Sequence, residues 1–574
     1  MSEERTHSAS VWVAQTSAVP NTDRGRARRR WTIVARITFL VAAVASPPGC
    51  DDLPPHANGG SGGASALGGR GPQSDGGASG EGGAASGGAA GGVGGLAGGD
   101  GLAGAGNRGG TTTTGPAGAS GSTAAGGSAG ETLPQPLGGR GGAAGAHAGS
   151  PSPPTECAAA QPWESSMFLS DQAQMDALPL VSEIAGDLFI ERGVERFERL
   201  GCLQKVAGTV AIRFTRTLTQ PRGLERLSSV GANLIIEGNE ALSSLASLQR
   251  LASIGGTLTI DANQGLTDLT GLRGLISIGA DLVITSNLAL DTLAGLESVA
   301  SVGGNLRISN NSVLRSIAAL TNLHAAGSLE LRYDDALSNL AGLGGMHEIR
   351  SLVVSGNAHL ASFDGLTGLA TIRDGLVIDD NDALISLGAL RSLTALTTLE
   401  IARNGALVHL VGLSGIVELD QLDISSNPAL VDLGGLAVAR ARSVQLTDNA
   451  SLRNVDGLGN LTGAHDLVVT QNPRLLDLAG LKALQGLMGS LVIGADDTLA
   501  SLHGLENVTG ADLLSVYQNP VLASLEALRA FAQVRSLSAV ANPKLPACEV
   551  HALFQRAGGQ VLEEIQNDAR AICR

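Results

Sequence analysis

Asparagine recurs from residue 239 to residue 542 of this chain at spacings of 22 to 24 residues, with two gaps in the series. Each copy lies among hydrophobic residues. In LTIDANQGLTDLTGL at 258–272, Leu258 and Ile260 precede Asn263, and Leu266 follows it. A repeat of this period is typical of a solenoid, in which each unit buries its apolar side against its neighbours. The repeated residues are Asn239, Asn263, Asn287, Asn311, Asn357, Asn381, Asn404, Asn427, Asn449, Asn472, Asn519 and Asn542.

The chemistry of asparagine suits a structural position at the end of a strand. Leu258 and Ile260 lie two residues apart, so both face the same side of a strand. Where the chain leaves that strand, a buried backbone group without a partner costs about 1–3 kcal/mol. Asparagine offers one acceptor and two donors, enough to bond its own turn and the adjacent coil. We therefore expect a ladder of structural asparagines instead of a ligand site.

Two aspartates, Asp334 and Asp496, fill the gaps in this series. An ionised carboxylate accepts hydrogen bonds but cannot donate them. The coils that contain Asp334 and Asp496 are therefore predicted to be local weak points.

The unit GLRGLISIGADLVITSNLALDTLAGL at 271–296 resembles the receptor L domain, the leucine-rich, right-handed β-helical fold of the insulin and epidermal growth factor receptor ectodomains. Its leucine follows the asparagine by three residues, as Leu290 follows Asn287. The resemblance covers roughly residues 180–545. Bacterial envelope lipoproteins built from such repeats are the nearer likeness, because the chain has no cysteine-rich module and no kinase segment.

The resemblance implies a mainly β fold. We expect a right-handed, single-stranded β-helix or leucine-rich-repeat-like solenoid of about 14–16 coils. A disordered Gly-rich linker would precede it, and a short C-terminal helical cap would close it.

The first 49 residues have the pattern of a secretory signal peptide. RGRARRR at 24–30 precedes the apolar run ITFLVAAVA at 37–45, which is shorter than the ~20 residues that a membrane-spanning helix needs. SPPGC then ends at Cys50 and resembles the bacterial lipobox, which implies lipidation of Cys50. An ordinary signal peptide cleaved nearby is the alternative. We expect an exported protein of the cell envelope, at the outer membrane or cell surface.

Residues 50–154 are dominated by glycine, serine and alanine, as in GGAASGGAAGGVGGLAGG. Such a segment cannot bury enough apolar area to offset the entropy lost on ordering. It is predicted to be a flexible, lipid-anchored linker.

Four further cysteines flank the regular repeats, and an exported protein would use them as disulfides that close the solenoid ends. The expected pairs are Cys157–Cys202 and Cys548–Cys573. A metal site is the rival interpretation, but no C-x-x-C motif or histidine cluster supports it. In EVHALFQRAGGQVLEEI, Val550, Leu553 and Phe554 have helical spacing. The expected parts are an N-terminal cap with atypical first coils (155–215), the solenoid (216–545) and a disulfide-closed helical cap (546–574).

Composition excludes several classes of function. The formal net charge is -15 and no basic stripe is present, which argues against nucleic acid as a partner. No nucleophile elbow, phosphate-binding loop or H-E-x-x-H motif occurs, and DDND at 379–382 lacks the spacing and glycine of an EF-hand. We expect no cofactor and no metal.

One stretch of outward-facing positions is richer in charge than the rest, which are mostly Thr, Ser, Asp, Val and Asn. It can be a solvated face with paired charges, a ligand-binding surface or, through Asp379 and Asp380, a catalytic carboxylate pair. Its residues are Arg307, Glu330, Arg332, Tyr333, Asp335, Asp379, Asp380, Glu400 and Arg403.

The favoured hypothesis is a non-enzymatic envelope lipoprotein, held at the membrane by its N-terminal lipid, whose solenoid binds an extracytoplasmic protein or glycan. A structural or adhesion spacer of the envelope is the alternative. A carbohydrate-active β-helix enzyme is less favoured, because those enzymes gather carboxylates, basic residues and stacking aromatics on one face, and aromatic residues are only 2% of this chain.

Overall fold

The computed structural model describes residues 155–487 and 489–571. The predicted signal peptide (1–49), the lipidation site Cys50 and the linker (50–154) lie outside the described residues, as does Cys573.

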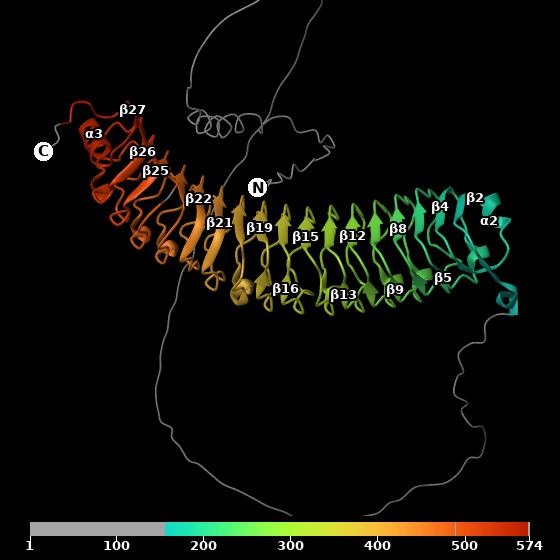
Figure 1. Ribbon diagram of the computed structural model, residues 1–574. Helices are drawn as coiled ribbons and strands as arrows, with labels where there is room; N and C mark the ends of the chain where they lie inside the picture. The colour runs from blue at the N-terminus through green and yellow to red at the C-terminus, as the bar shows by residue number, and fades with distance from the viewer. Residues whose placement is uncertain (1–154, 488, 572–574) are drawn as a thin grey trace, which may run out of the picture. The chain divides into compact units, whose positions relative to one another are not determined.

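One long parallel sheet forms the main wall of the solenoid. Neighbouring coils contribute neighbouring strands, so the strands follow one another in chain order (Figure 1). The first strand, β2, pairs with β4, and the last, β27, pairs with β26. The eighteen strands are β2 (Met167–Asp171), β4 (Leu188–Gly193), β6 (Val210–Arg213), β8 (Leu234–Glu237), β10 (Leu258–Asp261), β12 (Leu282–Thr285), β14 (Leu306–Ser309), β15 (Leu329–Arg332), β17 (Leu352–Ser355), β19 (Gly375–Asp379), β20 (Thr398–Ala402), β21 (Glu418–Ser425), β22 (Arg440–Thr447), β23 (Asp466–Thr470), β24 (Ser490–Gly494), β25 (Gly510–Tyr517), β26 (Gln533–Val540) and β27 (Val561–Ile565).

Shorter strands form a second parallel sheet earlier in each coil. From β21 on, several strands of the main sheet lengthen to eight residues, and their first residues take the place of the second sheet, as where Glu418 pairs with Arg440. The short strands are β1 (Gln161–Trp163), β3 (Val181–Ile184), β5 (Lys205–Val206), β7 (Ser229–Val230), β9 (Ser253–Ile254), β11 (Ser277–Ile278) and β13 (Ser301–Val302), with a separate pair β16 (Glu348–Ile349) and β18 (Thr371–Ile372).

Helical segments are short. The α-helices among the described residues are α2 (Gln172–Asp176) and α3 (Ala547–Arg556). A 3-10 segment, η2 (Thr155–Ala159), precedes the first strands. Short 3-10 turns form many of the bends between main-sheet strands: η3 (Glu198–Leu200), η4 (Ala246–Leu248), η5 (Thr270–Leu272), η6 (Ala318–Leu320), η7 (Gly388–Ser392), η8 (Asp456–Leu458), η9 (Ala479–Leu481) and η10 (Glu526–Leu528).

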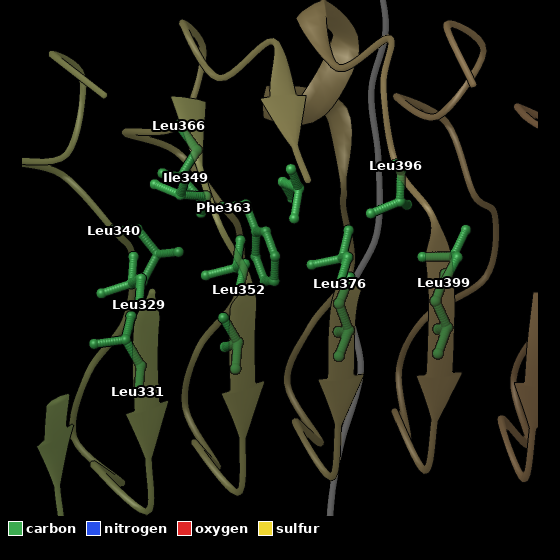
Figure 2. Close-up of a cluster of buried hydrophobic side chains, with 14 of the residues drawn as sticks. Leu329, Leu331, Leu340, Ile349, Leu352, Phe363, Leu366, Leu376, Leu396 and Leu399 are labelled. Atoms are coloured by element: carbon green, nitrogen blue, oxygen red, sulfur yellow. The ribbon is translucent and has the colours of Figure 1, made fainter. Parts of the chain in front are cut away.

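The core is a stack of aliphatic layers, one layer for each coil. In the coil that begins at Leu258, the side chains of Ile260, Leu266, Leu269 and Leu272 are fully buried. Figure 2 shows the equivalent side chains in the coils of β15 to β20, where leucines such as Leu352 and Leu376 line the interior. Truncating one such leucine to alanine lowers the free energy of unfolding by about 2–5 kcal/mol.

The asparagine ladder runs through this core. Asn263 Nδ2 donates to Ile236 O in the preceding coil (2.9 Å), to Asp261 O in its own turn (3.1 Å) and to Asn287 Oδ1 in the next coil (3.2 Å). Its own Oδ1 accepts from Asn239 Nδ2 at 3.0 Å. Ala262, directly before it, has a left-handed φ of +56°. All twelve asparagines of the repeat are buried with 0% exposure, so each serves the fold.

The ladder extends one rung beyond the repeat at each end. Thr215 donates through its backbone N–H and Oγ1 to Asn239 Oδ1. At the other end, Asn542 donates to Asn567 Oδ1 through its backbone N–H and its Nδ2, both at 3.2 Å. Neither residue follows the sequence pattern, since Thr215 is not asparagine and Asn567 follows Asn542 by 25 residues.

A second column of side-chain acceptors stabilises the bend that follows each rung. Asp268 Oδ1, for example, accepts from Thr270 N at 2.9 Å. The equivalent residue of most coils is Ser, Thr, Asn or Asp and accepts from the N–H two residues later: Ser244, Thr292, Ser316, Asn339, Ser362, Ser386, Asp432, Asn454, Asp477, Ser501 and Ser524. These bends are Asx and ST turns.

A disulfide between Cys157 and Cys202 closes the N-terminal end, with a Cα–Cα distance of 5.4 Å. The edge strand β2 is covered in part by α2, because Gln174 Oε1 accepts from Ser170 N at 2.7 Å. A covered edge has fewer free backbone groups with which another chain could pair.

The C-terminal end contains the expected helix. Val550 and Leu553 of α3 are buried, and Phe554 packs against the core. Cys548 is disulfide-bonded, and its pairing with Cys573 stays a prediction. The chain then forms one more coil with β27. There Glu564 occupies an inward position and lies 3.5 Å from His551 Nδ1. An inward charge on an edge strand opposes further strand pairing.

Candidate functional site

The charged residues singled out by sequence gather on the outward side of the main sheet. Leu306 and Ile308 of β14 face the core, so Arg307 between them faces solvent. Register pairs Arg307 with Glu330 of β15. The same register places Arg332, Ser355 and Asp379 side by side on β15, β17 and β19. A single strand, β17, therefore separates the two groups of charges.

The first group is a carboxylate between two guanidinium groups. Glu330 Oε2 lies 2.8 Å from Arg307 Nε, and Glu330 Oε1 lies 2.5 Å from Arg332 Nε. The side chain of Glu330 is 24% exposed, whereas that of Arg307 is 55% exposed. This group carries one net positive charge, and the guanidinium groups reach solvent.

Tyr333 extends the first group with an exposed aromatic ring. Its φ is +56°, and the residues before the other rungs are left-handed as well. Half of its surface is exposed. The ring lies against Gly356, the equivalent residue of the next coil, where a Cβ atom would overlap Tyr333 Cδ1. Gly356 therefore leaves the space in which the ring rests.

The second group is rich in carboxylates. Asp379 Oδ2 accepts from Arg403 Nη2 at 2.6 Å and from Ser355 Oγ at 3.4 Å. Glu400 of β20 is the register partner of Asp423 on β21. Asp380 follows Asp379 with a left-handed φ of +56°. One arginine thus faces several acidic side chains, which leaves this group negative.

Burial and mutual repulsion make these carboxyl groups harder to ionise. Burial raises the pKa of Glu400, the charges of Asp423 and Asp379 add to the rise, and Arg403 opposes it. The pKa of Asp380 is raised by burial and by Asp379 and Asp382. Burial also raises the pKa of Asp423, against a hydrogen bond with Ser425 and the charge of Arg403.

Asp423 is a member of this group that the sequence analysis missed. It follows Glu400 by one repeat of 23 residues, and that periodicity was the signal that could have identified it. Asp379 Oδ1 and Asp423 Oδ1 are both buried without a hydrogen-bond partner among the described residues. Each carboxylate therefore retains an acceptor that the fold leaves unused.

We call the combined surface the charged face, and its members lie on β14, β15, β19, β20 and β21 or directly after them. Asp335 is not a member. It follows the buried Asp334 into the turn, where its carbonyl oxygen accepts from His359 N at 3.2 Å. The charged face consists of Arg307, Glu330, Arg332, Tyr333, Asp379, Asp380, Glu400, Arg403 and Asp423.

A second exposed aromatic feature lies at the N-terminal end of the same outward side. Phe168 of β2 and Phe189 of β4 are stacked, with ring centroids 4.8 Å apart and planes within 4°. Phe168 is 68% exposed. Phe214, at the position equivalent to Tyr333, lies against Gly238. Sequence reasoning missed this feature because the first coils lack the asparagine that sets the register.

A hollow in the surface lies away from the charged face. A cavity of about 540 Å³ near the C-terminal end is lined by Thr509, Asp512, Gln533, Arg535 and Gln560, among others. Across residues 155–487 and 489–571, no group of three or more His, Cys, Asp or Glu side chains is arranged to hold a metal ion. In the same part of the chain, no helix has the length and hydrophobicity to cross a membrane.

Comparison with known proteins gives matches to solved structures at low sequence identity and low TM-score. The sequence matches no protein-family model and no curated protein. Among solved structures, a TLR13–ssRNA13 complex is similar at 14% identity and a TM-score of 0.25, covering 71% of this chain and 78% of that one. A Drosophila Toll–Spatzle complex is similar at 13% identity and a TM-score of 0.26, covering 70% and 68%. The fold of this chain is a mainly β, leucine-rich-repeat-like solenoid.

Proposed function

We propose that this chain is an exported, lipid-anchored envelope protein whose solenoid binds an extracytoplasmic protein or glycan through the charged face. The observation that carries the proposal is the gathering of exposed arginines, carboxylates and an exposed tyrosine on neighbouring strands of one sheet. Parallel strands hold these groups at fixed spacing of about 4.8 Å, so a partner that spans several coils meets a preorganised surface.

The two ends of the charged face carry opposite charge. Its β14–β15 end is positive through Arg307 and Arg332, and its β19–β21 end is negative through Asp379, Glu400 and Asp423. Complementary charge raises the association rate and excludes wrongly charged partners. A partner with the opposite order of charges, and an apolar or sugar surface to contact Tyr333, fits this arrangement.

Fixed ion pairs favour binding over catalysis at this face. Arg403 holds Asp379, the carboxylate that would act with Asp380 in a hydrolytic pair. A general acid or base must be free to exchange its proton with the substrate. We therefore propose a non-enzymatic role.

Matched variants on the same sheet test the binding proposal. Arg332→Glu and Tyr333→Ala should each lower retention of envelope proteins or arrayed glycans by immobilised full-length chain at least tenfold. Arg213→Glu and Phe214→Ala are the controls, because Arg213 lies in the same outward column and Phe214 packs on a glycine as Tyr333 does. Equal retention by all variants at unchanged melting temperature would refute the assignment to this face.

The anchor is tested separately. A metabolic fatty-acid label should appear on the wild-type chain and disappear from Cys50→Ala, and equal labelling of both would contradict lipidation at Cys50.

A further inference from the structure

The two aspartates in the ladder occupy rungs that asparagine fills elsewhere. Asn311 donates to Asp334 Oδ1 through its backbone N–H (2.9 Å) and its Nδ2 (3.1 Å). The backbone N–H of Asp334 donates onward to Asn357 Oδ1 at 3.1 Å. Asp496 has the same contacts. Its Oδ1 accepts from Asn472 N at 2.7 Å, and its backbone N–H donates to Asn519 Oδ1 at 3.3 Å. Both aspartates have 0% exposure.

The second carboxyl oxygen of each aspartate stands where asparagine has its donor. In an asparagine rung, Nδ2 donates only to oxygen atoms, as Asn357 Nδ2 does to Leu331 O, Ser355 O and Asn381 Oδ1. Asp334 Oδ2 and Asp496 Oδ2 are buried with no hydrogen-bond partner in the described part of the chain. An ionised oxygen here would face acceptors, whereas a protonated one would donate to them.

We infer that Asp334 and Asp496 are proton-dependent joints of the ladder. Each is held as a neutral carboxylic acid whose Oδ2–H replaces the asparagine Nδ2 donor. Loss of that proton leaves a buried anion among oxygen acceptors and loosens the coil that contains it. Ionisation of both residues would weaken the solenoid at two rungs and leave the other rungs intact.

The charges around each joint support this. Burial raises the pKa of Asp334 to about 7, hydrogen bonds from Asn311 oppose the rise, and Asp335 adds to it. Burial likewise raises the pKa of Asp496 to about 7, hydrogen bonds from Asn472 and the Gly494 backbone oppose the rise, and Asp497 adds to it. Other ionisable groups on the adjoining elements are Arg307, Glu330, Arg332, Tyr333 and His359 at the first joint, and Tyr517 at the second.

The direction of the pH effect follows from these values. Unfolded chain releases an aspartate proton near pH 3.9, whereas the folded chain keeps these two protons until about pH 7. Because the folded state binds more protons in this interval, stability falls as pH rises from about 4 to about 7 and then levels off.

The joint at Asp334 also bears on the charged face, a consequence that rests on the proposed function. Arg332 and Tyr333 directly precede Asp334, and Tyr333 holds the left-handed conformation that leads into the rung. Loosening this rung frees both side chains, so partner affinity should fall as pH rises through 7. Asp496 lies on a coil outside the charged face, which separates the two effects.

The test uses the full chain and no ligand, so its result is independent of the binding proposal. Melting temperature is measured from pH 4.5 to 8.5 for wild type, for D334N/D496N and for the control D364N/D420N, which changes two exposed aspartates outside the ladder. Asparagine is the residue of the other rungs, so the test variant retains the fold. D334N/D496N should melt several degrees above wild type at pH 8.5 and at nearly the same temperature at pH 4.5, while the control keeps the pH slope of wild type.

Infrared spectroscopy gives a second readout. Wild type at pH 6 should show the carbonyl stretch of a protonated carboxylic acid, and this band should be weaker in D334N/D496N. Parallel melting curves for wild type and D334N/D496N, or an equal carbonyl band in both, would overturn the inference.

Discussion

The ring of Tyr333 lies on Gly356, the residue one coil further along in the same left-handed position. The glycine has no side chain to displace the ring, and its φ of +71° is a conformation that other residues adopt at a cost. The pair fixes an exposed aromatic ring beside Arg332 and Glu330. It links the backbone geometry of the repeat to the surface proposed to bind.

Gly356→Ala should displace the Tyr333 ring. The added methyl group overlaps Tyr333 Cδ1 and the left-handed backbone is strained, so we expect a loss of about 1–3 kcal/mol in unfolding free energy. Partner retention should fall as well. Gly238→Ala is the matched control, because Gly238 lies under Phe214 in the same way. We expect Gly238→Ala to lose a comparable amount of stability and to keep partner retention. If both variants lost retention, the loss in Gly356→Ala would be due to reduced stability and not to the displaced Tyr333 ring.

Asn263→Ala should open the ladder locally. Its amide hydrogen bonds to Ile236 O, Asp261 O and Asn287 Oδ1 are lost, and Asn239 loses the acceptor of its backbone N–H and one of the two acceptors of its Nδ2. Since an unsatisfied buried group costs about 1–3 kcal/mol, the total loss should be about 3 kcal/mol or more. Hydrogen exchange should rise in the coils of β8 to β12. Gln264→Ala, at the exposed next residue, should change stability by less than about 0.5 kcal/mol. Equal effects would contradict the ladder.

Replacing both Cys157 and Cys202 with serine should loosen the N-terminal end. The disulfide spans 45 residues, and the chain-entropy relation gives about 4 kcal/mol for a loop of that size. Because each coil contacts only its neighbours, faster hydrogen exchange should be confined to the first coils, β2 to β6. Faster exchange throughout the solenoid would show that the end and the repeats unfold as one unit.

Asp423→Asn should make stability less dependent on pH in the acidic range. Burial raises the pKa of Asp423, so its ionisation destabilises the folded state as pH rises above the ordinary aspartate value. The variant should therefore melt slightly above wild type at pH 7 and at the same temperature near pH 3.5. Asp420→Asn, on an exposed residue of the same strand, should show no such difference. A larger gain at pH 3.5 than at pH 7 would contradict the assignment.

Sequence could predict the features that depend on one invariant chemical group. Asn263 and its counterparts are recognisable because the amide supplies the acceptor and both donors of the rung. The outward positions of β14 to β20 followed from that register, so Arg307, Glu330 and Arg332 could be placed on one face before the structure was known.

Features that several residue types can build were beyond the sequence. The bend column uses Asp268, Thr292, Ser316 and Asn339 interchangeably, since any side-chain oxygen can accept the same N–H. Asn567 was not predicted, because α3 lengthens its coil and places Asn567 25 residues after Asn542. The packing of the Tyr333 ring on Gly356 depends on the rotamer of the tyrosine side chain, and residue spacing does not predict a rotamer.

Site-specific photo-crosslinking tests the central claim, that the charged face is where a partner binds. A benzophenone amino acid would replace Tyr333 in the full-length chain within producing cells, and Phe214 in a parallel strain. We predict a discrete adduct from position 333 that disappears when Arg332→Glu is added, and no such adduct from position 214. The same adduct from both positions, or none from position 333 while the chain is correctly folded and exported, would contradict the account.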